Sequence, residues 1–303
     1  MTDTARRDRR RDLQVRHCLV AFVTVLAVLC LQAQAATRNF IWKASGTQGV
    51  VYLVGSVHLL TTDYYPIDPT FEQAFKTADL LVEELDMGDV LAPNSQMQML
   101  TRGMLPAGQT LDKVVSRQTL AAVVSKFNDL GMPVEPMKQF KPWLLSLTLQ
   151  GLEWQKAGFD ADLGLDKHFY DIAKAAGKRV QGLETLAFQI SRFDEMSMEL
   201  QDRLLAETLK ELETTKTSFT RMADAWKAGD APEIERIVLQ DLKTEPEMYQ
   251  RLLVDRNRTW LPKIEALFSR PAPAFVVVGA AHLVGADGLI EMLRAKGYAV
   301  EQM

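Results

Sequence analysis

The sequence predicts an α/β fold with a mixed central sheet, built from an N-terminal and a C-terminal strand–helix–strand unit and interrupted by a large, mostly helical insertion. Short apolar runs rich in β-branched and aromatic residues lie near both ends of the chain, and in each unit a segment with helical spacing separates two such runs. Between the two units, from roughly 91 to 270, the apolar residues mostly follow helical spacing. We therefore expect a single domain over residues 36–303, with the insertion as a cap or second layer.

The first 35 of the 303 residues have the pattern of a signal peptide. Five arginines lie within 6–11, an apolar run spans 18–31, and Ala33-Gln34-Ala35 has the small residues that signal peptidase requires. The apolar run is shorter than the roughly twenty residues of a membrane-spanning helix. We expect Sec-type export, cleavage after Ala35 and a periplasmic or secreted protein that meets the membrane only through this segment. An uncleaved N-terminal anchor is the alternative.

Cysteine content excludes stabilisation by disulfides, and charge excludes nucleic-acid binding. Both cysteines, Cys18 and Cys30, lie in the predicted signal peptide, so disulfides cannot stabilise the exported protein. The formal charge of the whole chain is −4. The signal peptide takes six of the 35 basic and three of the 39 acidic residues, which leaves 29 basic and 36 acidic residues and a charge of −7. An acidic chain without a basic stripe is a poor nucleic-acid binder, and we exclude that class.

The N-terminal unit begins with a predicted hairpin. Its strands are residues 40–44 and 50–54, and the turn between them contains two glycines. Asp68, followed by proline and threonine, marks the start of a helix. The apolar run of 79–85 then predicts a buried strand. The strands before and after this helix should be parallel, with a right-handed connection.

The C-terminal unit repeats this plan. Residues 274–278 form an apolar run that predicts a strand, 285–296 have helical spacing with a glycine after them, and 298–300 predict a final strand. The insertion contains one further predicted strand, over 178–183. Two apolar strands, one from each unit, are thus followed by a helix and another strand.

Two of the three histidines outside the signal peptide lie in the same four-residue context. Gly55 to His58 and Gly279 to His282 both have the sequence Gly-x-x-His and follow an apolar strand, whereas His168 does not. In open α/β sheets ligands bind at this edge, and imidazole is a common ligand of zinc and other first-row metals. We therefore expect the two strands to be neighbours and the two imidazoles to share a divalent metal ion. The alternative is a pair of hydrogen-bonded loop histidines without a ligand.

An acidic pair and an arginine are candidates for the rest of this site. Glu83 and Glu84 end an apolar strand, and because neighbouring strand residues point to opposite faces, one of them can face the cleft while the other does not. A solvated strand end is the alternative. Arg256 falls on the apolar face of a helix, where a guanidinium suits a carboxylate, a substrate carbonyl or a developing oxyanion. A structural ion pair with the acidic strand end explains this position equally well.

The order of these motifs resembles the TraB/GumN family over nearly all of the chain that follows the signal peptide. The matching segments are Gly55-Ser56-Val57-His58, Leu81-Val82-Glu83-Glu84-Leu85-Asp86, Gly164-Leu165-Asp166, Gly182-Leu183-Glu184-Thr185, Arg256-Asn257 with Trp260, and Val278-Gly279-Ala280-Ala281-His282-Leu283-Val284-Gly285. This family is related to the TIKI proteins, which are metal-dependent proteases, and to a wider superfamily with erythromycin esterase-like and ChaN-like haem-binding proteins.

The resemblance also implies a set of site residues. They are His58, His282, Glu84 and Arg256. Glu84 is favoured over Glu83 because the family's glutamate directly precedes Leu-Asp. The resemblance assigns no role to Asp166 or Glu184, although both lie in matching segments, and His168 matches no catalytic position.

From the two histidine loops and the resemblance we predict a metal-dependent peptidase or amide hydrolase that acts on a peptide or protein substrate. His58 and His282 would ligate manganese, cobalt or zinc. Glu84 would be a third ligand or the general base, and Arg256 would stabilise the tetrahedral oxyanion. Two alternatives remain: a non-catalytic envelope protein that sequesters haem or a peptide signal, and an accessory factor in polysaccharide export.

Overall fold

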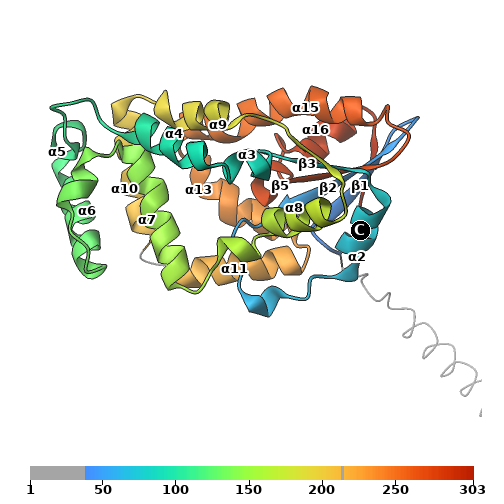
Figure 1. The fold of residues 1–303 in the computed structure, drawn as a ribbon, viewed down its shortest axis with the longest axis horizontal. Helices are drawn as coiled ribbons and strands as arrows, with labels where there is room; N and C mark the ends of the chain where they lie inside the picture. Colours follow the sequence, from blue (N-terminus) through green and yellow to red (C-terminus); the bar gives the residue numbers. More distant parts are fainter. Residues whose placement is uncertain (1–37, 213–214) are drawn as a thin grey trace, which may run out of the picture. The chain divides into compact units, whose positions relative to one another are not determined.

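A six-stranded sheet forms the centre of the computed structural model, which describes residues 38–212 and 215–303 (Figure 1). The strands are β1 (Ile41–Ser45), β2 (Val50–Ser56), β3 (Leu80–Glu83), β4 (Arg179–Gly182), β5 (Ala274–Gly279) and β6 (Ala299–Gln302). They lie in the order β4-β3-β5-β2-β1-β6. β1 pairs antiparallel with β2 and β6, and the pairs β2–β5, β5–β3 and β3–β4 are parallel. The predicted α/β class with a mixed central sheet is confirmed.

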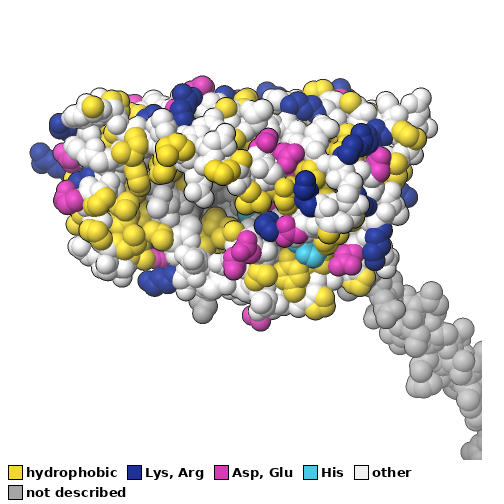
Figure 2. Space-filling model, viewed as in Figure 1, with side chains coloured by type: hydrophobic (Ala, Val, Ile, Leu, Met, Phe, Trp, Pro, Cys, Tyr) yellow, Lys and Arg dark blue, Asp and Glu magenta, His cyan; other side chains and the backbone are white. Residues whose placement is uncertain are grey.

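The predicted signal peptide lies outside the described residues. Residues from Asn39 to Met303 form one compact unit. No helix within the described ranges is both long and apolar enough to cross a bilayer. On the face drawn in Figure 2, basic and acidic side chains are interspersed and form no basic stripe.

The two strands that end in histidine loops lie side by side, as predicted. β2 and β5 pair in parallel from Val51 opposite Ala274 to Ser56 opposite Gly279. Every residue of β5 is buried. A continuous apolar run of this kind suits the middle of a parallel sheet that is covered on both faces. The pairing places the first residues of both loops at the same edge of the sheet.

Helices cover both faces of the sheet, and right-handed connections explain which helix lies on which face. α2 (Pro69–Thr77) connects β2 to β3, α8 (Leu165–Ala175) precedes β4, and both connections run toward the β4 edge. α16 (Leu289–Ala295) connects β5 to β6 in the opposite direction, so a right-handed crossover requires the other face. In Figure 1, α16 and α15 (Asp255–Leu267) lie above the sheet, and α2 and α8 lie below it.

The two crossover helices differ in how well the sequence predicts their start. α2 begins as predicted, with an aspartate N-cap and a proline in its first turn. α16 begins at Leu289 and not at 285. The preceding turn is held by Asn257, whose side-chain amide donates to the carbonyl oxygens of His282 and Asp287 at 3.3 and 2.8 Å. Gly285 has a φ of +78°, which no residue of a right-handed α-helix adopts, so the helix cannot begin there.

The insertion is mostly helical, as predicted, but it is divided into two parts by α8 and β4, which pack against and join the sheet. Its α-helices are α3 (Met87–Val90), α4 (Pro93–Gly103), α5 (Leu111–Val114), α6 (Arg117–Asp129), α7 (Pro142–Lys156), α9 (Leu186–Asp194), α10 (Met198–Glu211), α11 (Thr215–Lys227), α12 (Ala231–Ile234), α13 (Gln240–Leu242) and α14 (Pro246–Tyr249). Two π-helical segments, Glu235–Leu239 and Gln250–Val254, precede α13 and α15. α6, α7 and α10 share an apolar cluster that includes Phe127 and Leu145, apart from the core around the sheet (Figure 1).

Candidate metal and catalytic site

Four neighbouring strands each lead into a polar residue at the same edge of the sheet. In sheet order, Glu184 follows β4, Glu84 follows β3, His282 follows β5 and His58 follows β2. The backbone N–H of Glu184 donates to the carbonyl oxygen of Glu84 at 2.9 Å, which extends the pairing of β3 and β4 past the strand ends. Because the carboxyl ends of parallel strands meet at one edge, strand order alone brings distant parts of the chain together.

The side chains of His58, Glu84 and His282 converge on Gly279. A Cβ atom placed on Gly279 would lie 3.2 Å from Oε1 of Glu84, 3.4 Å from Nε2 of His58 and 3.6 Å from Cδ2 of His282. Any side chain at this position would fill the point that the three groups share, so the glycine of the second loop is required for space. The structure thus brings together the two predicted imidazoles and the predicted carboxylate.

His58 is oriented by Asp166 in the first turn of α8. Nδ1 of His58 lies 2.8 Å from Oδ2 of Asp166, and the hydroxyl of Ser56 donates to Oδ1 at 3.0 Å. Gly164 allows this approach, since a Cβ atom there would lie 2.1 Å from the carbonyl oxygen of His58. With Nδ1 donating to a carboxylate, Nε2 is the nitrogen that faces Gly279. The sequence assigned no role to Asp166, and the geometry makes it the orienting partner of His58.

The ring of His58 reaches solvent, with 56% of its side chain exposed. The negative charge of Asp166 is the main cause that raises the pKa of His58 to about 9, although burial of the inner part of the ring acts in the opposite direction. At neutral pH His58 is therefore protonated, and its charge is balanced by Asp166.

His282 is held by Asn257 from the helix α15. Nδ1 of His282 lies 2.7 Å from Oδ1 of Asn257. The amide nitrogen of Asn257 donates to two carbonyl oxygens, which fixes Oδ1 toward the ring. Nδ1 therefore carries the proton and Nε2 has a free lone pair, which accepts from Nη1 of Arg256 at 3.1 Å. Burial lowers the pKa of His282 to about 3, so the ring is neutral, as a metal ligand must be.

Glu84, and not Glu83, is the acidic residue at the shared point. Its Oε1 accepts from the backbone N–H of Gly279 at 2.7 Å, and its Oε2 accepts from Nη2 of Arg256. Burial would raise its pKa, but the charge of Arg256, with that of His58, holds the pKa of Glu84 well below its usual range. Glu83 lies on the other side of the strand, where its Oε2 lies 3.4 Å from the backbone N–H of Met87. Glu84 is thus an ionised carboxylate at neutral pH.

Arg256 is buried and held by two carboxylates. Its Nη2 donates to Glu84, and its Nε and Nη2 donate to Oε1 of Glu184 at 3.1 and 2.8 Å. Its guanidinium also lies over the ring of Trp260, 4.6 Å from the centroid. The indole N–H of Trp260 donates to Oε2 of Glu184 at 2.9 Å. The ion pair between Arg256 and the acidic strand end, one of the alternatives left open by the sequence, is present.

The donor atoms around Gly279 suit a first-row divalent cation. Among the described residues no group of three or more His, Cys, Asp or Glu side chains is already arranged around one metal position. Oε1 of Glu84 nevertheless lies 3.9 Å from Nε2 of His282, and Nε2 of His58 faces the same point. Two imidazoles oriented through Nδ1 and one carboxylate form a set that zinc, manganese and cobalt accept. Before a cation can bind to Nε2 of His282, the hydrogen bond from Nη1 of Arg256 to this nitrogen has to break.

Comparison with known proteins agrees with the family resemblance. The model of the TraB/PrgY/gumN family matches residues 40–302. The chain belongs to this family. It is 28% identical to the uncharacterized protein YbaP of Escherichia coli (strain K12) and to YbaP of Shigella flexneri, over 80% of this chain and 87% of each relative. It is 20% identical to an uncharacterized protein of Treponema pallidum, over 95% of this chain and 94% of that protein. No solved structure matches the chain.

The third histidine of this TraB/PrgY/gumN family chain lies away from the site. His168 is on α8, with its ring 5.5 Å from that of Tyr65 and 5.0 Å from that of Phe169. Burial lowers its pKa. Asn257 and Trp260 were parts of a matching segment without a role, and the structure places both against His282. The only sequence signal for Asn257 is its position next to Arg256 in the same matching segment, and the structure shows that its side chain is fully buried.

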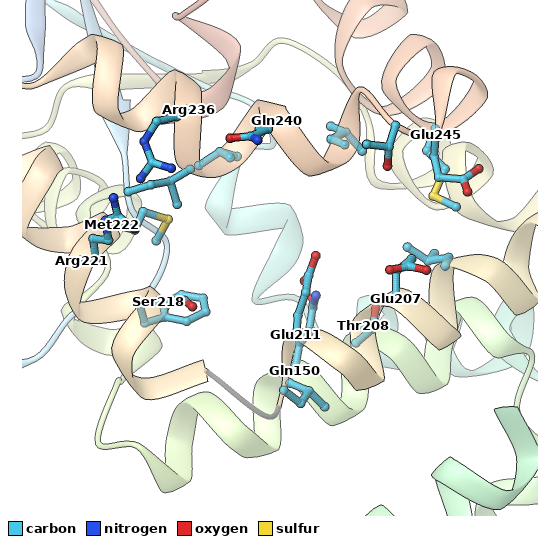
Figure 3. A pocket seen from close by; sticks show the side chains of 18 of the residues that line it. Gln150, Glu207, Thr208, Glu211, Ser218, Arg221, Met222, Arg236, Gln240 and Glu245 are labelled. Carbon is cyan, nitrogen blue, oxygen red and sulfur yellow. The ribbon is translucent and has the colours of Figure 1, made fainter. Parts of the chain in front are cut away.

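A separate cavity of about 690 Å³ lies within the helical insertion of this family member. Figure 3 shows Arg221 and Arg236 on one side of it, and Glu207 and Glu245 on the opposite side. Both arginines pair with Glu233. The described residues that line the cavity include none of the four predicted site residues.

Proposed function

We propose that this chain is an exported metal-dependent peptidase or amide hydrolase that acts in the periplasm or outside the cell. The pattern of the first 35 residues supports export. The convergence of His58 Nε2, Glu84 Oε1 and the ring of His282 on the space beside Gly279 is the observation that carries the proposed chemistry.

The two histidines and Glu84 would be the ligands of the cation. His58 and His282 would hold the cation through Nε2, since Asp166 and Asn257 occupy their Nδ1 atoms. A divalent ion there would supply a Lewis acid and a hydrolytic water at neutral pH. Glu84 is better suited to be the third ligand than the general base, because a carboxylate with so low a pKa accepts protons poorly.

Arg256 would stabilise negative charge on the substrate. Its guanidinium lies between Glu84 and His282, beside the shared point. Released from His282, Nη1 would be free to donate to the oxygen of a tetrahedral intermediate. The substrate class that fits this chemistry is a peptide or a protein, and manganese, cobalt and zinc are all compatible with the ligands.

Metal analysis of the purified protein tests the site directly. We expect the wild-type protein to take up about one manganese, cobalt or zinc ion, and the His58→Ala/His282→Ala double variant to take up none. His168→Ala is the matched control, because it removes the histidine that lies away from the site. Equal metal content in the wild type and the double variant would reject the site.

Cleavage of a peptide library tests the activity. The library is incubated with the protein and added manganese, cobalt or zinc, and the same assay is run on Glu84→Gln and Arg256→Lys. We expect cleavage that depends on the metal and falls by about a hundredfold or more in both variants. Tight binding of a peptide or of haem without cleavage would favour the non-catalytic binding function instead.

A further inference from the structure

Three charged side chains are buried together beside the proposed metal position. The exposed fractions of the Glu84, Glu184 and Arg256 side chains are 10%, 1% and 10%. Two carboxylates against one guanidinium leave this cluster with a formal charge of −1. A buried net negative charge next to a neutral imidazole favours a cation, because little solvent is present to screen it.

Both carboxylate oxygens of Glu184 accept hydrogen bonds from other side chains of the protein. Oε1 accepts from Nε and Nη2 of Arg256, and Oε2 accepts from the indole of Trp260 and, at 3.2 Å, from Nε of Arg256. Glu184 is thus fully hydrogen-bonded to groups that themselves face the site. It acts on the site through Arg256, and not as a ligand or a base.

The contacts of Arg256 are divided between two kinds of partner. Glu184 holds Nε and Nη2, and Nη1 reaches His282 and the carbonyl oxygen of Leu252. The three nitrogens belong to one rigid planar group, so while Glu184 holds Nε and Nη2 it is the His282 ring that would have to turn its Nε2 away from Nη1 to bind a cation. The guanidinium does not have to move away from Glu84 when a cation reaches His282.

We propose that Glu184 is the positioning residue that fixes Arg256 in the site. Through its negative charge, Glu184 also favours the binding of a divalent cation beside Arg256. The first part stands on the hydrogen bonds alone, and the second part rests on the proposed metal-dependent function. Without Glu184, the guanidinium would have Glu84 as its only carboxylate partner and would compete with the cation for that carboxylate and for His282.

Metal affinity of charge-matched variants tests the second part. The probe is manganese, cobalt or zinc alone, titrated into the full-length protein. Glu184→Gln brings the cluster to neutrality, and we expect its affinity to fall by about ten- to a hundredfold. The double variant Glu184→Gln/Arg256→Gln restores the charge of −1, and we expect its affinity to return to within about threefold of the wild type. A merely structural role predicts that the double variant binds more weakly than either single variant.

The Arg256 side chain itself reports on the first part, whether or not a metal binds. In the wild-type protein the buried Nε–H of Arg256 should give a slowly exchanging resonance in the guanidinium region of a nitrogen-correlated NMR spectrum. That resonance should be lost or rapidly exchanging in Glu184→Gln. Glu153→Gln is the matched control, because Glu153 is also a buried carboxylate but pairs with Lys126 in the insertion.

The outcomes separate the two proposals. A wild-type protein that takes up no metal rejects the proposed function, and the NMR signal then decides the role of Glu184 alone. An Arg256 resonance that is unchanged in Glu184→Gln overturns the positioning role. Unchanged metal affinity in Glu184→Gln, with normal uptake by the wild type, overturns the electrostatic part.

Discussion

Asn257 fixes the tautomer of His282. Its Oδ1 lies 2.7 Å from Nδ1 of the imidazole, and its amide nitrogen is held by the carbonyl oxygens of His282 and Asp287. The unprotonated Nε2 is therefore directed toward the site by a residue in a different helix. The same amide also holds the turn before α16, so one side chain links the ligand geometry to the local backbone.

Asn257→Ala should weaken metal binding. Loss of the acceptor lets the imidazole rotate and adopt the other tautomer, and we expect the affinity for manganese, cobalt or zinc to fall by about ten- to a hundredfold. Equilibrium dialysis measures this metal affinity. Gln201→Ala removes another fully buried amide, on α10, and should leave the affinity unchanged. Wild-type affinity in Asn257→Ala would contradict the orienting role.

Metal binding should release a proton from His58. Before a cation binds, Asp166 raises the pKa of His58 to about 9, and a ligand nitrogen must be unprotonated. At pH 7.5 binding should therefore release close to one proton, and affinity should rise with pH up to about 9 and then level off. Calorimetry in two buffers with different ionisation enthalpies measures the release. Because the side chain is largely exposed, added salt should reduce the effect.

Asp166→Asn is the control for this pH dependence. Without the carboxylate, the pKa of His58 should return toward 6.5, so proton release at pH 7.5 should be small. Binding of the metal by the wild type at pH 7.5 with no proton release would show that His58 is not a ligand.

Glu83→Gln should stabilise the protein at alkaline pH. Burial, together with the charge of Asp166, raises the pKa of Glu83 to about 9 from 4.5. The folded protein keeps a proton that the unfolded chain releases above pH 4.5, so the stability contributed by this group falls as pH rises from 4.5 to about 9. Glutamine does not ionise. We expect the free energy of unfolding at pH 8 to rise by about 1–3 kcal/mol.

Urea denaturation at pH 5 and pH 8 measures this change. The difference in stability between the two pH values should be smaller in Glu83→Gln than in the wild type. Glu247→Gln, at an exposed position on α14, should leave it unchanged. An equal pH dependence in Glu83→Gln and the wild type would rule out the buried carboxyl as its source.

Gly279→Ala should block the site without unfolding the protein. The backbone of Gly279 has φ −51° and ψ 137°, which alanine adopts freely. The added methyl group would lie 3.2–3.4 Å from Glu84 Oε1 and His58 Nε2 and fill the space between them. Metal affinity should fall by at least about tenfold, comparable to the loss of an orienting partner.

Gly151→Ala is the matched control for this substitution. Gly151 lies within α7, and a Cβ atom there has no neighbour within 4 Å among the described residues. Alanine should stabilise the helix by about 0.5–1 kcal/mol and leave metal binding unchanged. Undiminished metal binding by Gly279→Ala would place the ion elsewhere.

Local patterns in the sequence predicted the strands, the two histidine loops and the buried face of the helix that carries Arg256. They succeeded because apolar periodicity and turn residues act over a few positions. The pairing of β2 with β5 also followed, since both strands are continuous apolar runs that end in the same motif. The choice of Glu84 over Glu83 came from the family resemblance, because alternation along a strand separates the two faces without saying which one is the cleft.

The partners of the two histidines could not be predicted. Asp166 is 108 residues from His58, and the contact exists because the first turn of α8 packs against the first loop. Glu184 reaches Arg256 only because β4 lies beside β3 at the edge of the sheet. These contacts depend on how α8 packs against the first loop and on which strand lies beside β3, and neither follows from a local pattern. The metal ion and the reaction stay predictions.

The position of β5 between β3 and β2 also governs how this chain must assemble. During synthesis, β2 and β3 emerge long before β5, so the edge of each strand that pairs with β5 stays open until the last thirty or so residues follow, although β1 and β4 can already pair with their other edges. A nascent chain therefore exposes two unsatisfied strand edges, the feature that invites mispairing with other chains. The sheet closes late, through contacts between distant positions, and such topologies fold slowly. A chaperone that shields those edges until the C-terminus appears would raise the yield of native protein.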